Sequence, residues 1–392
     1  MLRYLKNVQP IVWIQTVGHA IIALISVILL PFLTLHMYNE FDGNLVLTTL
    51  IIGVQPLSEI LLTVTLGKWA DSLGRRPIIL TSLSLQFIAV AGFAFAETVW
   101  MFAVLGVLNA FGRFIYIPVS RAQIADLVHL EKQAETFAIL GMAESLGSLL
   151  APALGALFFQ VSRSYLFLFA AGLLFLYLLL CIKYLPESNG EGRQRTLDTE
   201  TIDFDEKRNS LLLMLMMGSA LPISFFHSQM ETNWPIYLEA YFVNYLMIFA
   251  LLETVGRVVY LFLEVVVVNR TSKFRIEKVV VSGYILYAMA ALIFGLAHHI
   301  IALVVAQILL CLASMISLNH LQGTISKLAP VNGRARYFAI FGTHWDISRS
   351  IGPFIGGWLL SQMGGGGLFL TVMTLILAGG WSQYRALLKI QL

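Results

Sequence analysis

Ionisable side chains stand inside long apolar stretches of this sequence, where they are the residues most able to do chemistry. Glu144 is the clearest example, because no Lys or Arg lies within one helical turn of it in the apolar run 136–159. Its partner must come from another segment, from water or from a proton. A medium of low dielectric constant favours the protonated form of a carboxylate, which is the property that a reversible proton carrier needs.

Charged groups in an apolar medium are costly unless they are paired or hydrated, so each is a functional candidate. We expect proton coupling to rest on Glu144, Glu231 or Asp346. Glu253 and Arg257 are spaced i, i+4, which favours a self-neutralised pair, whereas Asp346 and Arg349 leave pairing and ligand contact open. The predicted cavity residues are Gln15, His19, Gln55, Glu59, Arg113, Tyr116, Glu144, His227, Glu231, Trp234, Tyr237, Glu253, Arg257, Asn319, Trp345, Asp346 and Arg349.

The elements that carry these residues must lie in a membrane. Of the 392 residues, 58% are apolar and 12% are charged, whereas soluble domains carry about 25% charged residues. The apolar runs are nearly uninterrupted, so they predict helices and not the alternating strands of a membrane barrel. We predict an all-α membrane protein with spans near 11–35, 45–66, 78–96, 99–118, 136–159, 165–184, 211–229, 245–267, 279–297, 300–319, 337–360 and 367–384.

The cationic residues predict the orientation of these spans. Apart from Arg113, Arg163, Arg257 and Arg349, every Lys and Arg lies at a terminus or in alternate loops. Cationic loops stay on the cytoplasmic side. We therefore expect a multi-pass protein of the cell inner (plasma) membrane with both termini in the cytoplasm and the lipid bilayer as its surroundings.

The chain contains an internal repeat. Phe137–Gly141 (FAILG) recurs as Phe338–Gly342 (FAIFG), and the same offset pairs Pro152 with Pro353. Parallel repeats of six helices place a substrate cavity between the two halves. The predicted domains are an N-terminal six-helix bundle (1–185), a polar cytoplasmic linker (186–210) and a C-terminal six-helix bundle (211–392).

The loop after the second predicted span reads GKWADSLGRRP from Gly67 to Pro77. A topology signal alone would explain its two arginines, but the spacing of its glycines, its acid and its arginines resembles the signature loop of the major facilitator superfamily. The resemblance covers the whole chain and implies two pseudo-symmetric six-helix bundles that alternate access to the two sides. It also implies a conformational latch formed by Gly67, Asp71, Gly74, Arg75, Arg76, Arg121 and Glu187.

Small residues recur in the fifth and eleventh predicted spans, where they permit close helix packing. These packing residues are Gly147, Pro152 and Gly155 in one span and Gly352, Pro353 and Gly356 in the other. The pattern is similar to the helix-5 motif of the proton-coupled antiporters of this family. It departs from that motif at Ala151 and Ala156, and the family's arginine in the fourth span is replaced by Leu108.

The sequence indicates no cofactor. It contains no Walker loop, dinucleotide-binding motif or nucleophile elbow, and Cys181 and Cys311 both fall in predicted spans. The pair His298 and His299 has no obvious third ligand, so we expect no metal site. We expect small-molecule and proton partners, no nucleic acid, and a monomer.

Taken with the resemblance, these features favour a secondary transporter that exports a small organic molecule, of the multidrug efflux type, by proton exchange. One alternative keeps the fold and changes the cargo to a zwitterionic metabolite such as an opine-type metallophore, because the predicted cavity carries charges of both signs. No residue in the sequence indicates the direction of transport, so uptake is a further alternative to export. A membrane-embedded enzyme is the alternative from another class, and the two-half symmetry argues against it.

We predict that Asp71→Asn leaves the protein folded and impairs transport, because this acid should favour one conformation through ion pairing near the cytoplasmic face. Distances between labels on the cytoplasmic ends of the two halves measure the conformational balance. An unchanged distance distribution together with full transport would remove the latch role from Asp71.

Overall fold

The computed structural model describes residues 10–66, 74–128, 130–187, 204–328 and 334–391. All regular secondary structure in these ranges is α-helical. Ten of the described helices are long and apolar enough to cross a membrane, α2 contributes a shorter apolar stretch at Leu45–Leu61, and α12 contains two of the predicted spans. The predicted all-α membrane fold is confirmed.

The chain forms two compact units, Met1–Thr196 and Leu197–Leu392. Their border falls inside the predicted linker, 186–210. Residues 188–203 of that linker lie outside the described residues, and helix α7 begins at Phe204, within its last part. The predicted domain boundaries at 185 and 211 stay predictions.

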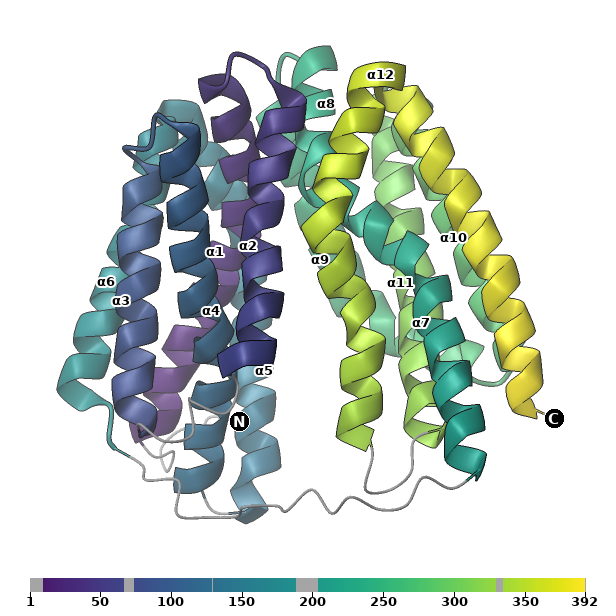
Figure 1. Ribbon diagram of the computed structural model, residues 1–392, viewed down its shortest axis with the longest axis horizontal. Coiled ribbons are helices and arrows are strands. Elements are labelled where there is room, and N and C mark those ends of the chain that lie inside the picture. The colour runs from purple at the N-terminus through teal and green to yellow at the C-terminus, as the bar shows by residue number, and fades with distance from the viewer. Residues whose placement is uncertain (1–9, 67–73, 129, 188–203, 329–333, 392) are drawn as a thin grey trace. The chain divides into compact units, whose positions relative to one another are not determined.

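The described residues of the N-terminal unit form six helices (Figure 1). They are α1 (Pro10–Glu40), α2 (Leu45–Leu66), α3 (Arg75–Phe93), α4 (Val99–Leu127), α5 (Leu130–Val161) and α6 (Arg163–Tyr184). Helix α1 packs on α5, α2 packs on α4, and α3 packs on both α4 and α6. Helices suit these segments because a helix satisfies its own backbone hydrogen bonds where no water is present.

Helix α4 is longer than the sequence predicted. The predicted span ended at residue 118, whereas α4 continues through Pro118 and Arg121 to Leu127. Neighbouring helices and polar side chains tolerate a proline inside a membrane helix. The added turns bring Ser120, Arg121 and Gln123 onto the same helix as Tyr116.

The contact between α1 and α5 depends on small residues. A Cβ atom at Gly147 would overlap the carbonyl oxygen of Ala20, and a Cβ atom at Gly155 would overlap the ring of Phe32. Two helix backbones can approach this closely only where a side chain is absent. Two of the predicted packing residues of α5, Gly147 and Gly155, therefore lie at a helix–helix contact.

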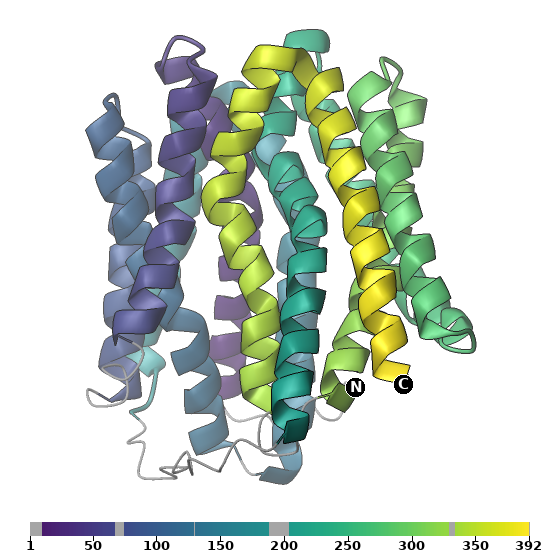
Figure 2. The ribbon, with the colours of Figure 1, turned by 45° about the vertical axis from the view of Figure 1, so that its right-hand side comes forward.

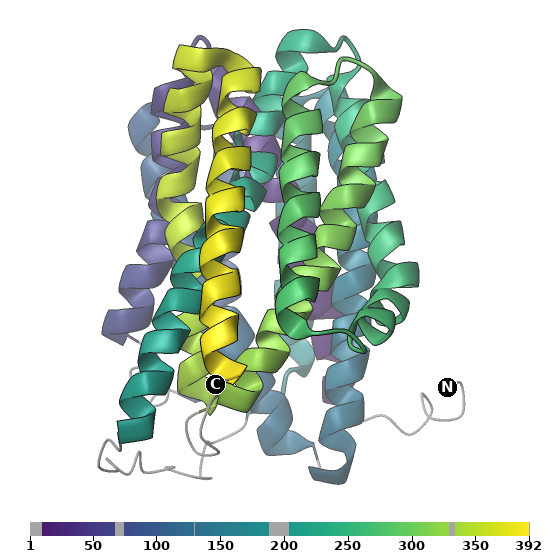
Figure 3. The same ribbon diagram turned by 90° about the vertical axis from the view of Figure 1, so that its right-hand side faces the viewer.

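The C-terminal unit contains α7 (Phe204–Glu231), α8 (Asn233–Tyr241), α9 (Tyr245–Thr271), α10 (Ile276–Leu296), α11 (Ile300–Leu328) and α12 (Arg334–Gln391). The first part of α12 runs beside α7 (Figure 2). Its second part runs beside α10 (Figure 3). Helix α11 packs on both α9 and α10.

Two details of the C-terminal unit differ from the sequence prediction. The predicted spans 337–360 and 367–384 leave a loop between them, but only Gly364 in that stretch leaves the helix, at φ 68°, and α12 continues on both sides of it. Glycine adopts positive φ without steric cost, so one residue is enough to turn the chain. The short helix α8 was not predicted, and its Trp234 packs edge-on against Phe294 in the core, with ring centroids 5.0 Å apart.

We predict that Gly147→Ala destabilises the protein by about 1–3 kcal/mol, the usual cost of forcing a methyl group into a closely packed contact. Thermal unfolding in detergent measures the effect. Gly172→Ala on α6 is the matched control, because a Cβ atom there would meet no neighbour within 4 Å. Equal melting temperatures for the two variants would contradict the close α1–α5 contact.

Candidate functional site

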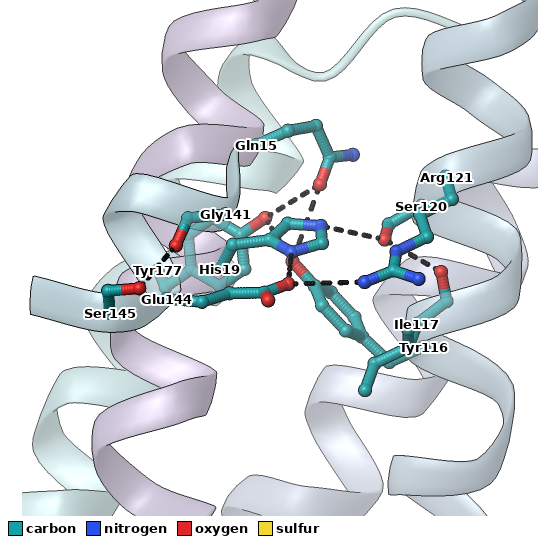
Figure 4. A network of polar contacts seen from close by, with 10 residues as sticks. All are labelled: Gln15, His19, Tyr116, Ile117, Ser120, Arg121, Gly141, Glu144, Ser145 and Tyr177. Carbon is teal, nitrogen blue, oxygen red and sulfur yellow. Dashed lines mark hydrogen bonds and ion pairs between the residues drawn. The ribbon is translucent and has the colours of Figure 1, made fainter. Parts of the chain in front are cut away.

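Glu144 meets an imidazole and a guanidinium from two other helices (Figure 4). Nδ1 of His19 on α1 lies 2.7 Å from Oε1 of Glu144. Nη2 of Arg121 on α4 lies 3.5 Å from the same oxygen. The sequence required a partner for Glu144 from another segment, from water or from a proton, and the structure supplies partners from two helices. We call His19, Glu144, Arg121 and Ser120 the His–Glu cluster.

The His–Glu cluster is buried at one end and accessible at the other. The side chain of His19 is 2% exposed, that of Glu144 is 35% exposed and that of Arg121 is 54% exposed. Nε2 of His19 lies 3.1 Å from Oγ of Ser120, so both ring nitrogens have a partner. A carboxylate held between a buried imidazole and an accessible guanidinium can gain or lose a proton without losing every partner.

A network of uncharged polar groups lies one helical turn from His19 on α1. Oε1 of Gln15 accepts hydrogen bonds from Tyr116 at 3.3 Å and Tyr177 at 3.4 Å, and the two hydroxyls lie 2.8 Å apart. A Cβ atom at Gly18 would overlap Tyr177, so this glycine lets α6 approach α1. Gln15 and Tyr116 were predicted to line a cavity, whereas Tyr177 was missed because it lies in an otherwise apolar run.

The described part of the signature loop makes contacts within the N-terminal unit. Gly74 has φ 81°, in the left-handed region that favours glycine. Arg75 Nε lies 3.4 Å from Oδ2 of Asp126, and Arg76 donates to the carbonyl of Ile182 at 2.7 Å. The backbone N–H of Arg76 donates to Oε1 of Glu187 at 3.3 Å.

The latch stays a prediction. Gly67 and Asp71 lie outside the described residues. Arg121 was predicted to join the latch, and among the described residues its carboxylate partner is Glu144.

Other predicted cavity residues of the N-terminal unit form a separate group on α2 and α4. Arg113 Nε lies 3.7 Å from Oε1 of Glu59. Gln55 accepts from Asn109 at 3.1 Å and donates to Glu59 at 3.4 Å. This group is therefore a paired acid and base with two amides beside it.

A further polar group lies in the C-terminal unit on α7, α10 and α12. Arg349 donates from Nη2 to Oε1 of Glu231 over 3.1 Å. Its guanidinium carbon lies 5.8 Å from the ring centroid of Trp345, within the range of a cation–π contact. His227, one turn before Glu231, lies 3.0 Å from Oη of Tyr287. The structure thus brings together four predicted cavity residues, His227, Glu231, Trp345 and Arg349. It adds Tyr287, which was not predicted from the sequence.

The remaining predicted residues of the C-terminal unit lie on α9, α11 and α12. Arg257 Nη2 lies 3.5 Å from Oε2 of Glu253, which confirms the i, i+4 pair. Asn319 donates to Glu264 at 3.1 Å. Asp346 lies on α12, one turn before Arg349. Within the described residues no three His, Cys, Asp or Glu side chains are grouped as metal ligands.

The chain is similar to known membrane transporters. Residues 16–353 match the family model of the Major Facilitator Superfamily. The uncharacterized MFS-type transporter YhjO of Bacillus subtilis (strain 168) is 34% identical over 374 residues, which cover 95% of this chain and 92% of YhjO. A Na⁺, Li⁺, K⁺/H⁺ antiporter of Planococcus maritimus is 24% identical over 359 residues, covering 82% of this chain and 83% of that protein. Tetracycline resistance protein class D of Salmonella ordonez is 24% identical over 327 residues, covering 80% of this chain and 79% of that protein.

We predict a favourable coupling energy of about 1–3 kcal/mol between His19 and Glu144, in the range of hydrogen bonds to charged groups. A double-mutant cycle with His19→Ala and Glu144→Gln, read by unfolding in detergent, measures this energy. The control cycle pairs Glu144→Gln with His36→Ala, because His36 lies 17 residues beyond His19 on α1 and contacts Phe102 and Phe167. Sites without shared partners should add to within about 0.5 kcal/mol. Additive effects in both cycles would contradict the contact.

Proposed function

The chain belongs to the Major Facilitator Superfamily, and from this premise we propose that it exports a small organic molecule in exchange for protons by alternating access. That it is a multi-pass membrane transporter and not an enzyme follows from the family itself. Export and proton coupling are the parts that we propose. The antiporter and the tetracycline resistance protein among its relatives support them, since one exchanges cations for protons and the other is named for drug resistance.

The observation that carries the proposal is the His–Glu cluster. Glu144 lies on α5, faces a buried imidazole and an accessible guanidinium, and keeps about a third of its own side chain exposed. In its deprotonated form the accessible carboxylate can pair with a cationic group of the cargo, and protonation removes the negative charge that this pairing needs. Glu144 therefore holds either a proton or the cationic group, so proton binding and cargo binding compete at this position, while the other groups of the cargo bind elsewhere.

The same geometry supports a proton pathway through Glu144. The exposed part of Glu144 exchanges its proton with the aqueous cavity, and His19 holds the carboxylate from the buried side. The protonated and deprotonated forms of Glu144 present different charges to the cavity in the two access states. A difference of this kind is what lets one ligand shift a conformational equilibrium.

A second cargo class has its own support. Three pairs of opposite charge lie among the predicted cavity residues. These pairs are Glu59 with Arg113, Glu253 with Arg257, and Glu231 with Arg349. A zwitterionic metabolite offers a carboxylate and an ammonium group that can replace the partners of such a pair, whereas a lipophilic cation can satisfy only the acids. Competition by amino acid-like zwitterions and by lipophilic cations separates the two classes.

The proposal includes location and topology. The alternating distribution of Lys and Arg supports a plasma-membrane protein with cytoplasmic termini. The cargo and protons are its proposed small-molecule partners, and the proposed oligomeric state is a monomer.

We predict that Glu144→Gln abolishes proton-driven export and preserves cargo binding and downhill exchange. The amide keeps the shape of the side chain and cannot titrate at this position. Substrate-dependent proton flux in proteoliposomes, measured against a panel of drugs, sugars and zwitterionic metabolites, tests both parts. Gln86→Met on α3 is the control, because this buried amide lies outside the His–Glu cluster.

Full proton-driven transport by Glu144→Gln would transfer the coupling role to Glu231, and Glu231→Gln tests that acid in the same assay. If both variants transport normally, Asp346→Asn is the remaining test. Normal coupling in all three variants would refute proton exchange at the proposed acids.

A further inference from the structure

Two glutamines form a buried amide pair between α1 and α4. Nε2 of Gln15 donates to Oε1 of Gln123 over 2.7 Å, and both side chains are fully buried. Nε2 of Gln123 donates in turn to the carbonyl oxygen of Pro186 over 2.8 Å. Each amide therefore uses its N–H group and its oxygen, because Oε1 of Gln15 accepts from two tyrosine hydroxyls.

Among the described residues, three side-chain hydrogen bonds join α1 to α4. His19 contacts Ser120, and Gln15 contacts both Gln123 and Tyr116. Gln15 and His19 are spaced i, i+4 on α1, and Ser120 and Gln123 are spaced i, i+3 on α4, so each pair shares one helix face. A change in the hydrogen bond between His19 and Ser120 therefore acts on the same two helix faces that carry Gln15 and Gln123.

Protonation of Glu144 changes the hydrogen bonds at Ser120. When Glu144 is a carboxylate it accepts from Nδ1–H of His19, and Nε2 then accepts from the Ser120 hydroxyl. When the Glu144 carboxyl is protonated and donates to Nδ1, Nε2–H donates to Oγ of Ser120. Oγ of Ser120 also donates to the carbonyl of Ile117 at 3.1 Å. Ser120 has one hydroxyl hydrogen, which therefore bonds either to the carbonyl of Ile117 or to Nε2 of His19, depending on whether Glu144 is protonated.

The other end of the amide pair reaches the described part of the signature loop. Pro186 is followed by Glu187, whose Oε1 accepts from the backbone N–H of Arg76 at 3.3 Å. Arg76 also donates to the carbonyl of Ile182, in the last turn of α6. The end of α6 is thus held by Gln123 from α4 and by Arg76 from α3.

Stability alone does not require amides at these positions. Replacing both partners of a buried hydrogen bond by apolar groups of the same shape is nearly neutral, whereas removing one partner is costly. Hydrogen bonds also have fixed directions, so the amide pair specifies one position of the α6 end relative to α1 and α4. An apolar pair would fill the same space and leave that position less defined.

We propose that Gln15 and Gln123 are positioning residues that couple the charge state of the His–Glu cluster to the position of the α6 end at Pro186 and Glu187. The inference rests on the proposed function in one respect, the role of Glu144 as the group that titrates. It extends that function by connecting the proton site to the loop whose residues the family resemblance makes a latch.

The test is hydrogen–deuterium exchange of the full-length protein in lipid nanodiscs, read at the backbone amides of residues 181–185 and 187. Glu144→Gln imitates the protonated carboxylate, and we expect it to change the exchange rates of these amides. A factor between about 5 and 150 corresponds to the usual range of coupling between sites. In the Gln15→Met/Gln123→Met background the same Glu144→Gln substitution should leave the exchange rates of these amides unchanged.

Gln86→Met is the matched control, because it removes a buried amide of the same unit that contacts Ser82 and not the amide pair. In that background the response of 181–187 to Glu144→Gln should be preserved. The proposal is overturned if Glu144→Gln has no effect in the parent chain, or if its effect persists in the double methionine background. The assay uses no cargo, so its outcome is separate from that of the export assay.

A reciprocal measurement covers the case in which the double methionine variant fails to fold. Coupling between two sites acts equally in both directions, so Glu187→Gln should shift the pH midpoint at which Glu144 titrates. The carboxylic acid stretch in infrared difference spectra, assigned by its loss in Glu144→Gln, reports that midpoint. A shift of about 0.7–2 pH units is expected from the same coupling range, and an unchanged midpoint would overturn the proposal.

Discussion

The contact between Nδ1 of His19 and Oε1 of Glu144 is the constraint on which the rest of the N-terminal unit depends. An isolated carboxylate is costly in a membrane, so α1 and α4 must both approach α5 closely enough to supply partners. The absence of side chains at Gly147 and Gly155 allows α1 to do so. The extension of α4 beyond Pro118 places Arg121 within 3.5 Å of the carboxylate. The close packing of α1 on α5 and the polar partners of Glu144 thus favour the same arrangement of α1, α4 and α5.

Much of the architecture could be predicted from the sequence, because lipid imposes a simple rule on it. Long apolar runs with charges confined to alternate loops predict membrane helices and their order. Glu144 also stood out, since a carboxylate in an apolar run requires a partner. The i, i+4 spacing of Glu253 and Arg257 predicted their ion pair because that contact is local. Local rules were sufficient wherever both partners lay on one helix.

Contacts between helices could not be predicted in the same way. The partners of Glu144 lie 125 and 23 positions away in the chain, and no local periodicity connects them. Tyr177 and Gln123 gave no signal, since one lies in an apolar run and the other lies past the predicted end of its span. The loop predicted between the spans 337–360 and 367–384 was wrong for a different reason, which lies in the run Gly364–Gly367. Its composition is that of a flexible linker, but a single positive φ at Gly364 suffices for the turn, and helical hydrogen bonding retains the other three glycines.

The central claim is that Glu144 exchanges a proton when cargo binds. Calorimetric titration of the purified protein with a transported compound, repeated in buffers of different ionisation enthalpy, counts the protons released per molecule bound. The account predicts that Glu144→Gln still binds the compound and releases about one proton fewer than the parent chain at the same pH. Equal proton release by the two proteins would contradict it.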